Sequence, residues 1–160
     1  MLRFANYDIV FQEFPDEVTL AINLSGCPCR CAGCHSQYLW DDVGDELTAD
    51  RLIALAAHYG RGITCVGLMG GDNDPAEVLR LLDELRCARP DLRTGWYSGR
   101  QQLPDCFASH PAPDYVKLGP WREALGPLSA PTTNQRLYRY GRDGRCDDIT
   151  ALMQVKGLKL

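Results

Sequence analysis

Long apolar runs are absent from the 160-residue sequence, since no stretch approaches the roughly 18 residues that a membrane-spanning helix needs. An excess of positive charge is also absent. The 17 Lys and Arg residues stand against 21 Asp and Glu, a net charge of −4 that excludes a broadly basic nucleic-acid-binding protein. The N-terminal segment MLRFANYDIVFQEFPDE lacks the uninterrupted apolar stretch of a secretory signal. We therefore expect a cytoplasmic protein with neither a membrane nor a nucleic-acid partner.

Histidine is scarce, with three in the chain, and the sequence offers no Ser–His–Asp signature of nucleophilic catalysis. The bias of disordered or fibrous proteins is missing as well, because 45% of the residues are hydrophobic and 24% are charged. No internal repeat or long linker divides the chain. We expect residues 1–160 to form a single domain with its own core.

Cysteine, in contrast, is abundant: the chain has eight, and four of them fall within eight residues. These four are Cys27, Cys29, Cys31 and Cys34, whereas the others are scattered singly. A disulfide framework is not expected in a reducing cytosol, and a dense cluster beside single cysteines is typical of one metal site. Thiolates are soft ligands that favour zinc, copper(I) or iron–sulfur groups. Structural zinc usually takes two separated ligand pairs, which this chain does not offer.

Short apolar strands alternate with amphipathic helices in the middle of the chain, which predicts an α/β domain with a mostly parallel sheet. Strands are predicted over residues 17–24, 63–69, 93–97 and 115–118, and helices over 48–59, after Asp74 and over 103–109. A hairpin around residues 141–144 is predicted to close the chain. Ligands bind at the carboxyl ends of parallel strands. The cysteine loop after residue 24 and the glycine pair after residue 69 should therefore share one edge of the sheet.

Three of the clustered cysteines have the spacing Cys27-x3-Cys31-x2-Cys34 directly after a predicted strand. This loop resembles the CxxxCxxC loop of radical S-adenosylmethionine (SAM) enzymes. The resemblance implies that the three thiolates hold three irons of a 4Fe–4S cluster, and that the fourth iron stays open for SAM. It also implies a partial (β/α) barrel of radical SAM type as the fold, to which the short C-terminal hairpin is added.

Two other residues of the loop, Cys29 and His35, have two interpretations each. We interpret Cys29 as a free thiol, and the alternative is a fourth protein ligand that closes the cluster. Gly33 lets the backbone approach a ligand closely. His35 stands where the family usually has an aromatic residue near the adenine of SAM, and the alternative is a surface histidine. The resemblance thus places Gly33, Cys34 and His35 at the cofactor.

A second motif, Gly70-Gly71-Asp72, follows the strand predicted over residues 63–69. A double glycine by itself predicts a turn. Beside the cysteine loop it resembles the GGE-type motif of radical SAM proteins. That resemblance implies that bare backbone binds the SAM amino group, where a Cβ would collide with the methionine moiety. Asp72 replaces the commoner Glu, and we interpret it as a residue that orients the loop.

The short length of the chain and the sequence of its tail point to one group within the radical SAM enzymes. The segments CPCRCAGCHSQYLW, TGWYSG and TTNQR are similar to activating enzymes of glycyl-radical proteins, above all to those of anaerobic ribonucleoside-triphosphate reductase. The resemblance implies that one electron from flavodoxin or ferredoxin splits SAM into methionine and a 5′-deoxyadenosyl radical. That radical takes a hydrogen atom from a backbone glycine of the reductase. No catalytic acid, base or nucleophile is assigned in this chain.

The tail over residues 119–160 falls outside the alternating pattern, and we expect it to dock the partner. Asn134 and Gln135 can bond backbone groups and pin a lid over the cofactor, and the alternative is a plain polar loop. The arginines either grip an acidic partner segment or form a solvated face; they are Arg100, Arg136, Arg139, Arg142 and Arg145.

Two rival functions remain open at this point. One is another small radical SAM enzyme that acts on a small molecule, of the 7-carboxy-7-deazaguanine synthase type. The other is a non-enzymatic iron–sulfur module that transfers electrons through a closed cluster. The response of the cluster to SAM separates the second rival from an enzyme, and the identity of the substrate separates the first.

Overall fold

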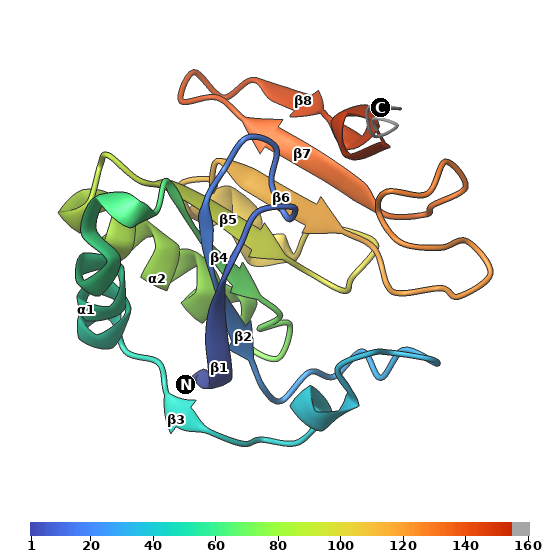
Figure 1. Ribbon diagram of the computed structural model, residues 1–160, viewed down its shortest axis with the longest axis horizontal. Coiled ribbons are helices and arrows are strands. Elements are labelled where there is room, and N and C mark those ends of the chain that lie inside the picture. Colours follow the sequence, from blue (N-terminus) through green and yellow to red (C-terminus); the bar gives the residue numbers. More distant parts are fainter. Residues whose placement is uncertain (155–160) are drawn as a thin grey trace.

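The computed structural model describes residues 1–154, which form one eight-stranded sheet in the order β3-β1-β2-β4-β5-β6-β7-β8 (Figure 1). The strands are β1 Arg3–Val10, β2 Thr19–Leu24, β3 Asp45–Glu46, β4 Cys65–Met69, β5 Arg93–Tyr97, β6 Tyr115–Leu118, β7 Arg136–Tyr140 and β8 Cys146–Asp148. The α-helices in this part of the chain are α1 Ala49–Tyr59 and α2 Pro75–Ala88. Short 3-10 helices are η1 Gln37–Trp40, η2 Gly60–Gly62, η3 Asp105–Ser109 and η4 Thr150–Gln154.

The expected partial (β/α) barrel with a mostly parallel sheet is wrong, because antiparallel pairings outnumber parallel ones. The inner strands β2, β4, β5 and β6 pair in parallel. Strand β1 pairs antiparallel with β2 and β3, and β7 pairs antiparallel with β6 and β8. With α1 and α2 as the only α-helices of residues 1–154, most strands lack the crossover helix of a (β/α) unit. The predicted C-terminal hairpin is confirmed by β7 and β8.

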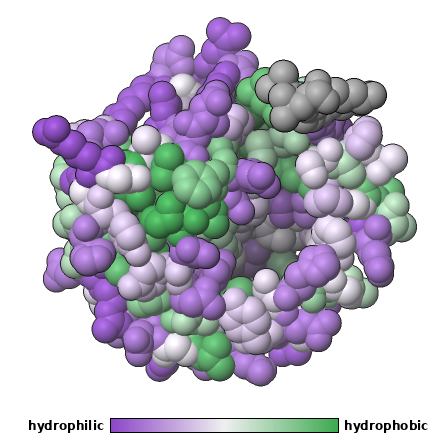
Figure 2. All heavy atoms as spheres, in the orientation of Figure 1, coloured by the Kyte–Doolittle hydropathy of each residue, from purple (hydrophilic) through white to green (hydrophobic). Residues whose placement is uncertain are grey.

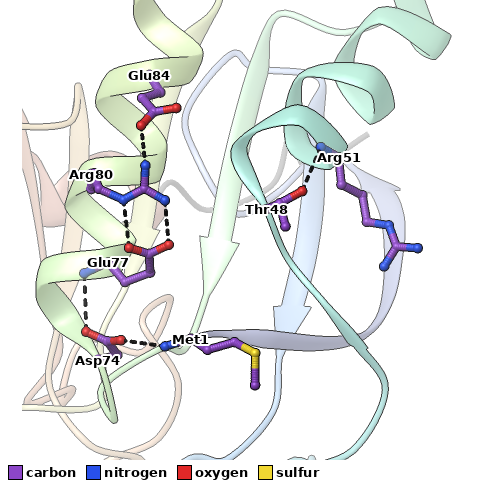
Figure 3. Close-up of polar contacts among 7 residues, drawn as sticks. All are labelled: Met1, Thr48, Arg51, Asp74, Glu77, Arg80 and Glu84. Atoms are coloured by element: carbon purple, nitrogen blue, oxygen red, sulfur yellow. Dashed lines mark hydrogen bonds and ion pairs between the residues drawn. The ribbon is translucent and has the colours of Figure 1, made fainter.

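Both helices begin where the sequence predicts a cap (Figure 3). Thr48 accepts a hydrogen bond from the backbone N–H of Arg51 at 3.2 Å, and Asp74 accepts one from the backbone N–H of Glu77 at 3.4 Å. Asp74 also pairs with the N-terminal ammonium group of Met1 at 3.0 Å. These contacts fix where α2 begins, shortly after the turn that follows β4.

The sheet carries a hydrophobic core on each of its two faces, because successive strand residues point to opposite sides. Helices α1 and α2 cover one face, where their leucines pack against the inner strands. On the other face a second core surrounds Phe14, which belongs to the β1–β2 connection and is completely buried. The Phe14 ring stacks on Tyr115 at a centroid distance of 4.9 Å and meets Tyr97 edge-on at 5.3 Å.

Two paired glycines make room for this ring. Gly67 of β4 and Gly95 of β5 are partners in the parallel ladder. A Cβ on Gly95 would lie 2.3, 2.5 and 2.9 Å from three atoms of the Phe14 ring, and a Cβ on Gly67 would lie 2.9 Å from the same ring. We call Gly67, Gly95, Tyr97 and Tyr115 the Phe14 socket. Glycine is needed at both strand positions because the ring lies directly on the backbone.

The molecular surface is hollowed near its centre in the view of Figure 2. On the face of the sheet that carries Phe14, a cavity of about 720 Å³ is lined by residues 11–16, Tyr97, residues 127–129, Leu152 and Met153. Tyr97 is the last residue of β5. The cavity therefore reaches the carboxyl end of β5.

Candidate metal and cofactor site

The segments that the sequence singles out lie together at the carboxyl ends of the inner strands. The cysteine loop, which we define as residues 25–36, follows β2, and residues 70–72 follow β4. These two strands are parallel neighbours, and a Cβ on Gly70 would lie 3.3 Å from the carbonyl oxygen of Leu24. The expectation that both segments share one edge of the sheet is therefore confirmed. Ser98 follows β5 and Gly119 follows β6, so they reach the same edge.

Backbone hydrogen bonds give the cysteine loop a defined shape. The N–H of Cys27 donates to the carbonyl oxygen of Leu39 at 2.9 Å, which closes the base of the loop. Inside it, the N–H of Cys34 donates to the carbonyl oxygen of Cys31 at 3.1 Å. Gly33 has a φ of +73°, which glycine adopts without strain. The loop thus holds its thiols next to the strand ends in a fixed turn.

The four thiols of the loop are half-buried and free of disulfides. The thiol of Cys29 donates to the carboxylate of Asp72 at 3.7 Å. The neighbouring Cys29 thiol lowers the pKa of Cys27 to about 6, whereas the nearby Cys27, burial and the Asp72 carboxylate raise the pKa of Cys29, which keeps its proton. The backbone N–H of Ser36 donates to the sulfur of Cys34 at 3.4 Å. Cys27 is thus available as a thiolate near neutral pH, and Cys29 acts as a donor.

No three Cys, His, Asp or Glu side chains within residues 1–154 converge on a position for a single metal ion. A 4Fe–4S cluster makes a different demand, since each iron takes one thiolate at the corner of a cube with an edge of about 2.7 Å. Its ligands surround a volume rather than a point. The donor set fits such a group, because the soft thiolates of Cys27, Cys31 and Cys34 belong to one short, closed loop.

Asp72 connects the segments that follow three strands. Asp72 is buried, with 6% of its surface exposed. Its carboxylate accepts from the Ser98 hydroxyl at 2.5 Å and from the backbone N–H of Gly99 at 2.8 Å. The thiol of Cys29 is its third donor. The carboxylate therefore joins the loops after β2, β4 and β5, which fits the interpretation that Asp72 orients its loop.

We expect Asp72→Asn to loosen this junction. The amide replaces one acceptor oxygen by a donor group, which then faces the N–H of Gly99 or the hydroxyl of Ser98. The free energy of unfolding should fall by about 1–3 kcal/mol in chemical denaturation. Ser98→Ala removes a single donor and should cost less. An Asp72→Asn protein that is as stable as the wild type would contradict this assignment.

Gly71 is required by packing inside the core. Its φ is +90°, and a Cβ would lie 2.4 Å from Cγ2 of Val78 and 2.9 Å from Cδ1 of Leu24. Both side chains belong to the core that α2 covers. The added carbon therefore meets the core, so packing by itself requires glycine here, and the expected collision with the methionine moiety stays a prediction. The carbonyl oxygen of Gly70 accepts from the Trp96 indole at 2.8 Å. Contact between the glycine pair and the SAM amino group stays a prediction.

Lys117 is a buried residue at the site that the sequence motifs did not reveal. Its ammonium group donates to the carbonyl oxygens of Ser98 at 3.3 Å and Gly119 at 2.8 Å. Burial lowers its pKa to about 8, while Asp72 and the loop cysteines act in the opposite direction. A charged Lys117 therefore favours negative charge in the cysteine loop. Its sequence signal is a lysine inside the apolar strand predicted over residues 115–118.

His35 and Gly33 share a neighbour that the sequence motifs did not include either. The His35 ring packs against Trp121, from the loop after β6, with centroids 5.3 Å apart and planes at 58°. A Cβ on Gly33 would lie 3.4 Å from Nε1 of Trp121. Among the residues that the structure describes, this buried nitrogen has no hydrogen-bond partner. Trp121 thus belongs to the surroundings of the predicted cofactor-binding residues.

Comparisons with known proteins add no family to these observations. A scan against protein-family models, a search of curated proteins and a search of solved structures each found no match. In the part of the chain that the structure describes, no helix combines the length and the apolar surface that crossing a bilayer requires. The functional assignment therefore rests on the geometry of the cysteine loop and its neighbours.

Within the tail, residues 134 and 135 support the loop that carries Trp121. The amide of Asn134 donates to the carbonyl oxygen of Pro120 at 3.1 Å. Gln135 is buried, and its amide lies 3.5 Å from the same oxygen. These contacts hold the first residues of the tail, which include Trp121, against residues 134 and 135. Docking of a partner by the tail stays a prediction, and residues 155–160 of that tail lie outside the described residues.

Proposed function

We propose that this protein is a radical SAM enzyme that generates the glycyl radical on anaerobic ribonucleoside-triphosphate reductase. The observation that carries the proposal is the closed cysteine loop beside residues 70–72 at one edge of the sheet. Cys27, Cys31 and Cys34 provide three thiolates, which leaves the fourth iron of a 4Fe–4S cluster without a protein ligand. A catalytic metal site keeps such a position open for its substrate.

In this proposal the residues of the chain bind, shield and orient the cluster and SAM. A 4Fe–4S cluster held by Cys27, Cys31 and Cys34 would supply the electron for reductive cleavage of SAM, the chemistry that generates a glycyl radical on a partner protein. Lys117 places a buried positive charge near the thiols, which stabilises an anionic group in the loop. Asp72 holds the loops after β4 and β5 against the cysteine loop. The ring of His35, in that loop, packs against Trp121.

The contacts of Cys29 favour an open cluster over a closed one. Its thiol donates to Asp72 at 3.7 Å. A fourth iron ligand would have to lose this proton and this bond. The contacts therefore support an enzyme that binds SAM over an electron-transfer module whose cluster is closed by four protein thiolates.

An open surface on the Phe14 side of the sheet supports a protein substrate. The cavity of about 720 Å³ reaches Tyr97 at the end of β5. A backbone glycine can approach the strand ends only if an extended segment of the partner has access from such a surface. We place the protein in the cytoplasm, with reduced flavodoxin or ferredoxin as electron donor, because a thiolate site of this kind persists in a reducing compartment.

An anaerobic titration with SAM tests the proposal. Reconstituted protein reduced with dithionite should give the electron paramagnetic resonance (EPR) signal of a 4Fe–4S cluster. Addition of SAM should change that signal, because SAM binds at the open iron. Turnover should release methionine and 5′-deoxyadenosine, which chromatography measures. A cluster whose signal ignores SAM would contradict the proposal and favour the electron-transfer module.

Activation of the partner has a separate readout. Protein that cleaves SAM should produce an EPR-detectable glycyl radical when it is incubated with the glycyl-radical subunit of the reductase. The radical should be absent when SAM or the reductant is omitted. Cleavage of SAM without any radical on the reductase would contradict the choice of partner and leave a small molecule as the substrate.

A further inference from the structure

Trp121 carries an unpaired polar group next to the cysteine loop. Its ring packs against His35, with centroids 5.3 Å apart. Its indole Nε1–H is buried and finds no acceptor within the described part of the chain. A Cβ on Gly33 would lie 3.4 Å from this nitrogen. The N–H therefore adjoins the stretch of the loop between Cys31 and Cys34.

A buried N–H without an acceptor is costly in a folded protein. Buried indole nitrogens usually find a partner, and an unpaired group costs about 1–3 kcal/mol. The carboxylate of Glu123 lies 3.4 Å from the same Cβ position on Gly33, yet it does not accept this bond. An acceptor bound in the cysteine loop would remove the cost. The unpaired group thus points to a ligand with acceptor atoms beside residues 31–34.

We propose that Trp121 Nε1–H donates a hydrogen bond to a sulfur atom of the iron–sulfur group held by Cys31 and Cys34, and that this bond raises the reduction potential of the group. The inference rests on the proposed function, because it requires a cluster in the loop. Hydrogen bonds to cluster sulfurs are one of the main factors that set the potential. They stabilise the reduced form more than the oxidised form, since the reduced form carries more negative charge.

The segment that carries Trp121 is held firmly enough to keep a donor in one place. Asn134 donates to the carbonyl oxygen of Pro120 at 3.1 Å. The N–H of Gly119 donates to the carbonyl oxygen of Arg100 at 2.7 Å. A donor fixed in this way loses little conformational entropy when it forms a bond. The first part of the tail therefore acts at the cofactor, in addition to the docking role predicted from the sequence.

A potentiometric titration of the reconstituted protein, followed by EPR without SAM, tests the inference independently of activity. Trp121→Phe keeps an aromatic ring against His35 and removes the N–H, so the midpoint potential should fall below that of the wild type. Tyr59→Phe is the control, because it also keeps an aromatic ring and removes a polar hydrogen. Tyr59 is the last residue of α1, away from the cysteine loop, and its exchange should leave the potential unchanged. Equal potentials in Trp121→Phe and the wild type would overturn the inference.

Asn134→Ala gives a second test that keeps the indole in the protein. Loss of the bond to Pro120 loosens the segment that holds Trp121, so the potential should fall in the same direction but by less. Arg136→Ala, which removes a partner of Asp148 at 3.8 Å, should have no effect. If Trp121→Phe assembles no cluster, an unchanged potential in Asn134→Ala overturns the inference.

The two proposals fail in different ways. A wild-type protein that takes up no cluster, or a cluster that ignores SAM, contradicts the proposed function and removes the basis of the inference. A cluster that responds to SAM but has the same potential in the wild type, Trp121→Phe and Asn134→Ala contradicts the inference alone. A lowered potential in both variants, with unchanged controls, supports it.

Discussion

Gly95→Ala should strongly destabilise the protein, although it adds a single methyl group. The new Cβ would lie 2.3, 2.5 and 2.9 Å from three atoms of the Phe14 ring. That ring is completely buried and contacts Tyr97 and Tyr115, so it cannot move aside without opening the second core. Overpacking a core typically costs about 1–3 kcal/mol, and these contacts place the expected loss at or above roughly 3 kcal/mol. Chemical denaturation measures the loss.

A double-mutant cycle identifies Phe14 as the cause. Phe14→Ala alone should cost about 3–5 kcal/mol, because it empties the Phe14 socket. Once the ring is gone, adding Gly95→Ala should change the free energy of unfolding by less than about 0.5 kcal/mol, since the methyl group then enters empty space. The summed single losses should therefore greatly exceed the loss of the double variant. Additive losses would contradict a direct contact between the two positions.

Gly62→Ala is the matched control for a glycine-to-alanine exchange. A Cβ on Gly62 meets no atom within 4 Å, and the residue does not have a positive φ. Its exchange should be neutral or slightly stabilising, because alanine restricts the unfolded chain. A loss at Gly62 as large as that at Gly95 would attribute the effect to the exchange itself rather than to the Phe14 socket.

The inner elements of the fold were predictable from the sequence. The strands over residues 93–97 and 115–118 have the predicted bounds, because each is a short run between turn-forming residues. The helices were predictable for the same kind of local reason. Thr48 and Asp74 cap their first turns, and apolar residues recur at helical spacing behind them. These signals lie within one element and need no knowledge of its neighbours.

The overall topology was not predictable from such local signals. Strand β1 gives little warning, because its burial pattern alternates only in part and its sequence RFANYDIV includes polar residues on both faces. Strand β1 lies beside β2 and runs antiparallel to it, which ends the parallel part of the sheet on that side. The role of Phe14 was hidden for a related reason. Its partners Gly67 and Gly95 belong to strands far along the chain, and the contact exists only in the folded sheet.

The candidate site likewise has residues that the sequence could predict and residues that only the folded structure reveals. The cysteine loop and residues 70–72 carry motifs and follow strands, so their common edge could be inferred from the sequence. Lys117 and Trp121 carry no motif. Their position depends on the ladder between β5 and β6 and on the loop that follows β6. The packing reason for Gly71 also appeared only once Val78 and Leu24 were placed around it.

Single exchanges to alanine at Cys27, Cys31 and Cys34 should each abolish the 4Fe–4S absorbance or its response to SAM. Each thiolate holds one iron, so its loss leaves a second iron open to solvent and the cluster labile. The measurement is visible absorbance and EPR after anaerobic reconstitution, with circular dichroism to show that the variants fold. Cys87→Ala is the control, since Cys87 is exposed and lies on α2. It should behave like the wild type.

Cys29→Ala should retain both the cluster and its response to SAM, which separates a donor from a ligand. The Cys29 thiol lies within the same short loop and donates to Asp72 at 3.7 Å. The exchange removes that bond, so a modest loss of stability, about 0.5–1.5 kcal/mol, is expected. Three thiolates and the open iron remain. Loss of the cluster in Cys29→Ala, together with its retention in any one of Cys27→Ala, Cys31→Ala or Cys34→Ala, would reassign the ligand set and with it the iron that SAM can reach.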